Sequence, residues 1–123
     1  MTNGQSSMGV QPNLGGLLCY APCCIGLVFS IVAAIVEKQS RFIRFHAFQS
    51  LLVHAAGLVI FVALGMGYMV AAMVAGPLAL LVWGVEMLVA LGFLALTVFL
   101  MMKAYANEEY KLPTLGEQAS KWV

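Results

Sequence analysis

The stretch that decides the fold is Glu37-Lys38-Gln39-Ser40-Arg41-Phe42-Ile43-Arg44-Phe45-His46-Ala47-Phe48-Gln49-Ser50, the only long polar interruption between Leu14 and Met102. It carries three of the six basic residues of the chain, including both arginines. The segments on either side of it are apolar and long enough to form helices. The stretch therefore predicts a connection between helices that cross a membrane.

The composition supports a membrane protein. The chain has 123 residues, of which 63% are hydrophobic and 9% are charged, whereas a soluble domain usually carries about a quarter charged residues. The bilayer is the solvent that suits so apolar a surface. The net charge of +1 indicates no nucleic-acid partner, and the length fits a single domain.

Three spans are expected in an all-α bundle. The first, residues 14–36, is uncharged over a length that crosses a bilayer, with a kink expected at Pro22. The second covers about residues 45–74 and the third about residues 78–102. Ala75-Gly76-Pro77 separates them, because glycine ends helices well and proline can begin one. The transmembrane domain is therefore expected over residues 14–103.

The two ends of the chain are expected outside the bilayer. Residues 1–13 have no charged side chain and predict a disordered tail, without the basic segment of a cleaved signal peptide. Residues 104–123 are polar and predict a cytoplasmic tail. With three spans, every lysine and arginine lies on the side of the C-terminus. The positive-inside rule then places the N-terminus outside a cell (inner) membrane and the C-terminus in the cytoplasm.

The second helix is expected to begin at the membrane surface, before its span. Ser40 is a plausible N-cap from which the helix continues unbroken through Gln49. Arg41 and Arg44 lie on one flank, where they can reach lipid headgroups. One inward-facing polar face is predicted, made of His46, Gln49, Ser50, Val53 and Gly57.

Glu86 is the one acidic residue inside a predicted span. Because a buried carboxylate is costly unless protonated or paired, it is either a proton or cation site or a neutral carboxyl that holds the bundle together. Tyr68 lies at a similar depth on the preceding helix. We expect Glu86 to point inward, to be largely protonated, and to have Tyr68 as its nearest polar side chain.

The remaining candidate residues suggest packing more than chemistry. His46 is expected to orient the loop, and His54 to join a hydrogen-bonded layer within the membrane. Cys19, Cys23 and Cys24 are expected to be packing residues, with a disulfide or a lipid attachment as alternatives. No Ser-His-Asp pattern, phosphate-binding loop or carboxylate pair is present in the sequence. We expect no enzyme activity, metal or cofactor.

Two motifs together resemble a known family. RFHAFQS at residues 44–50 opens the second span, and KAY at residues 103–105 with YKLP at 110–113 and Gly116 follows the third. The pairing is similar to small bacterial membrane proteins related to the channel-like subunit of the chloroplast inner-envelope protein import translocon. The resemblance implies a multi-pass helical membrane protein and, from the plant subunit, protein translocation. That subunit is usually described with four spans, whereas three are predicted here.

Three functions follow from these observations. The first is a component of a translocation or insertion channel, supported by the resemblance and the polar face of the second helix. The second is a structural or accessory subunit that binds another membrane protein, or copies of itself, through faces of small residues. The third is a proton- or ion-coupled carrier that uses Glu86. Beyond the lipid bilayer and a membrane-protein partner, the sequence identifies no ligand.

Overall fold

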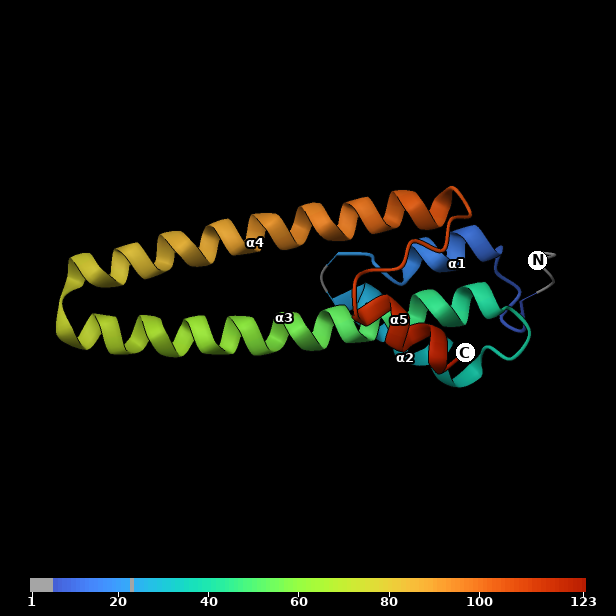
Figure 1. The fold of residues 1–123 in the computed structure, drawn as a ribbon, viewed down its shortest axis with the longest axis horizontal. Helices are drawn as coiled ribbons and strands as arrows, with labels where there is room; N and C mark the ends of the chain where they lie inside the picture. The colour runs from blue at the N-terminus through green and yellow to red at the C-terminus, as the bar shows by residue number, and fades with distance from the viewer. Residues whose placement is uncertain (1–5, 23) are drawn as a thin grey trace.

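The protein consists of five helices, which a computed structural model describes for residues 6–22 and 24–123 (Figure 1). Within these residues there is no β-strand, so the predicted all-α class is confirmed. The helices in chain order are α1 (Pro12–Leu18), α2 (Cys24–Val36), α3 (Arg41–Val74), α4 (Gly76–Tyr105) and α5 (Leu115–Lys121).

The two long helices α3 and α4 form an antiparallel hairpin (Figure 1). As predicted, α3 begins after Ser40, whose side chain accepts a hydrogen bond from the N–H of Ile43 at 3.3 Å, and the helix continues without a break. Ala75 is extended, and Pro77 stands in the first turn of α4, where its missing N–H costs nothing. Both helices are long and apolar enough to cross a membrane.

The predicted first span is wrong, because residues 14–36 do not form one helix. α2 has 13 residues and reaches only about 20 Å, short of the roughly 30 Å hydrocarbon core. The turn before it packs tightly: a Cβ placed on Gly26 would lie 2.4 Å from the carbonyl oxygen of Ala21. Pro22, in this turn, also interrupts helical hydrogen bonding. The residues that the structure describes therefore contain two candidate spans and not three.

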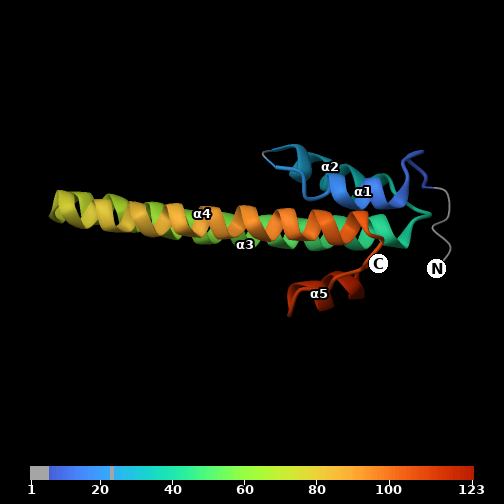
Figure 2. The same ribbon diagram turned by 90° about the horizontal axis from the view of Figure 1, so that it is seen from above.

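α1 and α2 form a short hairpin, the α1–α2 hairpin, that lies beside one half of the long hairpin (Figures 1 and 2). Ser6 and Ser7, which precede α1, are hydrogen-bonded to Glu37, which follows α2. Both ends of the short hairpin are therefore at the same end of the molecule. The prediction that residues 1–13 and the 37–45 loop lie on opposite sides of the membrane is wrong for the described part, from Ser6 onward.

The segment after α4 returns along α3. The ion pair between Arg41 and Glu109 places its first residues beside the start of α3, at the end of the molecule that we call the charged end. α5 then packs on α3, on the side opposite the α1–α2 hairpin (Figure 2). The rings of Trp122 and Phe48 meet edge to face, 5.8 Å apart. Residues 104–123, predicted only as a polar tail, thus contain a short packed helix.

Candidate functional site

A buried polar cluster lies where α1, α2, α3 and the segment after α4 meet. We define the polar cluster as Tyr20, Ser30, His46, Gln49 and Ser50, all with fully buried side chains. His46, Gln49 and Ser50 lie in the second and third helical turns of α3. The sequence predicted His46, Gln49 and Ser50 on one inward face, and the structure brings them together.

Gln49 connects three segments of the chain. Its amide nitrogen donates to the Tyr20 hydroxyl at 2.9 Å and to the carbonyl oxygen of Tyr110 at 3.0 Å. Its amide oxygen accepts from the N–H of Leu112 at 3.1 Å. Gly116 is packed so closely that an added Cβ would lie 2.5 Å from this oxygen. One side chain thus fixes the turn after α1 and the segment before α5.

Tyr20 and His46 share a hydrogen bond of 3.1 Å between the phenol oxygen and Nδ1. The phenol oxygen also accepts a hydrogen bond from the Gln49 amide. The other ring nitrogen of His46, Nε2, is buried. The ring is packed edge to face against Phe42 and Phe45. His46 is therefore an internal residue of the cluster.

The two serines of the cluster satisfy a backbone carbonyl in the turn between α1 and α2. The hydroxyls of Ser30 and Ser50 both donate to the carbonyl oxygen of Cys19, at 3.0 and 2.5 Å. Non-helical backbone at membrane depth is tolerated only where protein buries it and satisfies its hydrogen bonds. These contacts meet that condition for Cys19 and explain why a break can occur inside so apolar a segment.

Glu37 closes the α1–α2 hairpin at its other end. We call its contacts the Glu37 clasp. The fully buried carboxylate accepts from the hydroxyls of Ser6 and Ser7 and from the N–H groups of Ser7, Gln39 and Ser40. Burial raises the pKa of the carboxyl, but these hydrogen bonds outweigh that effect and lower the pKa from 4.5 to about 2. The clasp therefore holds an ionised carboxylate at neutral pH.

Glu86 lies on the face of α4 that carries buried Ala79, Thr97 and Leu100, and it is half-buried. Its position on this face agrees with the predicted inward orientation. No hydrogen bond joins it to another described residue, Tyr68 included. Its protonated state stays a prediction.

The two arginines behave differently from each other. Arg41 forms an ion pair with Glu109 at 3.3 Å, at the surface of the charged end. The guanidinium of Arg44 lies 5.9 Å from the Phe48 ring centre, and its Nε is buried without a partner among the described residues. Arg41 therefore pairs within the protein, although headgroup contact was expected for both.

Neither of the two described cysteines forms a disulfide. Cys19 is buried, Cys24 is exposed, and both are free thiols, whereas Cys23 lies outside the described residues. No group of three or more His, Cys, Asp or Glu residues that could hold a metal ion occurs within residues 6–22 and 24–123.

Sequence reasoning missed Tyr20 and Glu37 as members of this region. Tyr20 falls just before Pro22, a turn indication that could have separated it from an uninterrupted span. Nothing in the sequence linked Glu37 to the serines near the N-terminus, which are about thirty positions away.

Two long apolar helices, with all charged side chains except Glu86 gathered at one end, define a small helical membrane protein. Residues 5–117 match a family model described as the magnetosome magnetite crystal formation protein family, and the chain belongs to this family. Membership in this family gives no support to the predicted link to the chloroplast translocon.

Archaeal membrane proteins are similar over nearly the whole chain. A UPF0132 membrane protein of Methanocaldococcus jannaschii is 33% identical, over 97% of this chain and 94% of its own length. A second one from the same organism is 30% identical, over 94% of this chain and 73% of its own length. A UPF0132 membrane protein of Archaeoglobus fulgidus is 29% identical, over 93% of this chain and 97% of its own. No solved structure matches.

Proposed function

We propose that this chain is a non-enzymatic structural membrane protein that favours curved bilayer, because it takes more space in one leaflet than in the other. The observation that carries the proposal is the α1–α2 hairpin, which lies beside only one half of the α3–α4 hairpin (Figure 2). The other half consists of two helices alone. The cross-section is therefore larger at the charged end.

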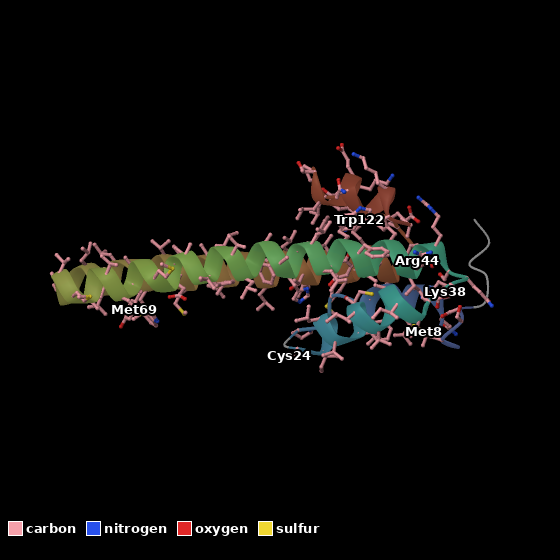
Figure 3. All side chains as sticks on the ribbon, turned by 90° about the horizontal axis from the view of Figure 1, so that it is seen from below. Met8, Cys24, Lys38, Arg44, Met69 and Trp122 are labelled. Atoms are coloured by element: carbon pink, nitrogen blue, oxygen red, sulfur yellow. The ribbon has the colours of Figure 1, made fainter. Side chains whose placement is uncertain are left out.

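The aromatic and charged residues suggest where the bilayer lies. Lys103 marks the charged end of α4, and Trp83, half exposed, lies about 30 Å away along the same helix at 1.5 Å per residue. Tyr68 is at the level of Trp83, since a Cβ on Gly67 would lie 4.0 Å from Val82. This distance equals an average hydrocarbon core, and the apolar ends of α3 and α4 continue beyond it. Met69 lies near the far end of the long hairpin (Figure 3).

α2 belongs in lipid by the same reasoning. Its outer face is apolar and exposed, and consists of Ile25, Val28, Ile31, Val32, Ile35 and Val36. Its length of about 20 Å reaches somewhat past the middle of a 30 Å core. All six lysines and arginines lie at the charged end, so the positive-inside rule places that end in the cytoplasm. In this arrangement both described ends of the chain face the cytoplasm.

The expected asymmetry is large for so small a protein. A helix with its side chains is about 10–12 Å wide, so two additional helices occupy roughly 150–220 Å² in the inner leaflet. The leaflet with the larger area becomes the convex side of a curved membrane. A wedge must also be rigid, and the polar cluster with the Glu37 clasp supplies fixed contacts at both ends of the α1–α2 hairpin.

The other candidate functions have less support. His46, Gln49 and Ser50, which suggested a polar translocation groove, are buried and bonded inside the protein. A carrier would rest on Glu86 alone, without a basic partner. An accessory subunit or homo-oligomer is the second candidate: a Cβ on Gly65, Gly84 or Gly92 meets no atom within 4 Å, so another helix can approach the long hairpin there.

Sorting between flat and tubular membrane tests the proposal. Fluorescently labelled protein is reconstituted into giant vesicles, a narrow tube is pulled, and the protein density in the tube is compared with that in the vesicle. We expect enrichment in the tube when the charged end faces the tube exterior, and depletion when it faces the lumen. Equal partition in the two orientations would refute the wedge and leave the accessory role.

A further inference from the structure

The tip of the α1–α2 hairpin leaves an apolar cavity against the long hairpin. Its volume is about 510 Å³, within the range of small-molecule sites. Cys24, at the tip in Figure 3, and Phe93 of α4 lie on its wall. The other lining residues are Leu27, Leu51, His54, Ala55, Gly57, Leu58 and Phe61. Leu58 is 66% exposed, so the cavity opens sideways toward lipid.

His54 is the polar side chain in this wall that has a free ring nitrogen. Its Nδ1 lies 2.8 Å from the carbonyl oxygen of Ser50, and a carbonyl only accepts hydrogen bonds. With its proton on Nδ1, the ring presents Nε2 as an acceptor. No described residue bonds to Nε2. The ring stands edge-on to Phe93, with 6.3 Å between the ring centres, and both rings also border a second hollow of about 300 Å³ on the side of Pro22.

We propose that this cavity binds a membrane-dissolved molecule with a hydrocarbon body and one hydroxyl group, which donates to Nε2 of His54. The apolar wall suits the hydrocarbon body, and a single acceptor selects a single donor. His54 is about 20 Å along α3 from Arg41, a depth that charged headgroups do not reach without cost. Entry past Leu58 requires no passage through water. This inference goes beyond the wedge function and does not depend on it.

A pair of photoreactive probes tests the proposal on the full chain in nanodiscs. One probe is a diazirine-bearing hexadecanol, and the other is the same diazirine-bearing chain without the hydroxyl. We expect the alcohol to label the α3 segment around His54 and Leu58 at lower concentration than the alkane. An excess of unlabelled hexadecanol should compete with this labelling.

Three variants distinguish recognition of the hydroxyl group from nonspecific occupation of the cavity. His54→Phe keeps an aromatic ring and removes the acceptor, so alcohol labelling should fall about 3- to 10-fold while alkane labelling is unchanged. Ala55→Phe fills the mouth of the cavity and should reduce labelling by both probes. Leu88→Phe, on a lipid-exposed face of α4, should change neither. Equal labelling by the two probes in the original chain, or full alcohol labelling in His54→Phe, would overturn the proposal.

Discussion

The Glu37 clasp can be opened by a single substitution, and the effect should be measurable at three backbone positions. Ser7, Gln39 and Ser40 donate their N–H groups to the Glu37 carboxylate at 3.0, 2.9 and 2.9 Å. All three donate to the same carboxylate oxygen, Oε1, which Glu37→Ala removes. Glu37→Gln keeps one neutral acceptor oxygen but loses the charge and the second oxygen.

The pKa of Glu37 sets the expected magnitude. Its lowering from 4.5 to about 2 corresponds to about 3 kcal/mol of clasp stability at neutral pH, since one pKa unit is worth about 1.4 kcal/mol. Because this shift compares the ionised with the neutral carboxyl, loss of the charge alone in Glu37→Gln should raise the opening equilibrium about 100-fold. Glu37→Ala also removes the acceptor oxygens and should raise the opening equilibrium at least as much.

The direction of the pH dependence follows from the same values. Because the folded-state pKa is lowered, the contribution of Glu37 is complete above pH 4.5 and is lost as the pH falls through about 2. Between pH 5 and pH 2, the original protein should therefore approach the behaviour of Glu37→Gln, which is likewise neutral.

Amide hydrogen exchange in nanodiscs measures this opening directly. Protection at Ser7, Gln39 and Ser40 should fall together in the two Glu37 variants, while amides in the middle of α4 stay protected. Glu117→Gln, an exposed acidic residue of α5, is the matched control and should change nothing. Unchanged protection in Glu37→Ala would show that the carboxylate does not hold the two segments together.

Three further predictions concern topology, packing and the acidic residue of α4. Reporters fused to the two chain ends should lie on the same side of the membrane and a reporter in the α3–α4 turn on the other; opposite sides for the two ends would restore the three-span arrangement. Gly116→Ala should destabilise the packing of α5 by about 1–3 kcal/mol, measured as Trp122 emission during denaturant titration, because the new Cβ would lie 2.5 Å from the Gln49 side chain. Gly84→Ala, where a Cβ meets nothing, should be neutral. Glu86→Gln should leave the fold intact and remove a protonated-carboxyl band from the infrared spectrum; absence of that band in the original protein would contradict the predicted protonation.

The parts of the fold that depend on local chemistry could be predicted from the sequence. The Ser40 cap and the Ala75-Gly76-Pro77 break act on neighbouring residues, and both appear where expected. The shared face of His46, Gln49 and Ser50 follows from helical periodicity alone. Its partners do not, because Tyr20 and the segment after α4 are brought to it by tertiary packing.

Hydropathy alone could not predict that the first apolar segment is divided into α1 and α2. A run of apolar residues has the same mean hydropathy whether it crosses the membrane or turns back within it. The chain can turn back only if the backbone groups of the turn find hydrogen-bond partners. Here the hydroxyls of Ser30 and Ser50 donate to the Cys19 carbonyl oxygen. Such hydrogen bonds between distant segments leave no periodic trace. The same reason explains why Glu37 was predicted only as part of a loop.

The length of the long hairpin has a consequence for where the protein can reside. α3 and α4 measure about 51 and 45 Å, which exceeds a hydrocarbon core of roughly 30 Å. The surplus includes the turn, where Met73 and Val74 are among the most exposed apolar side chains. Such hydrophobic mismatch is relieved by tilting the helices or by a thicker bilayer. Bilayer thickness should therefore sort this protein among membrane regions, with the thicker regions favoured.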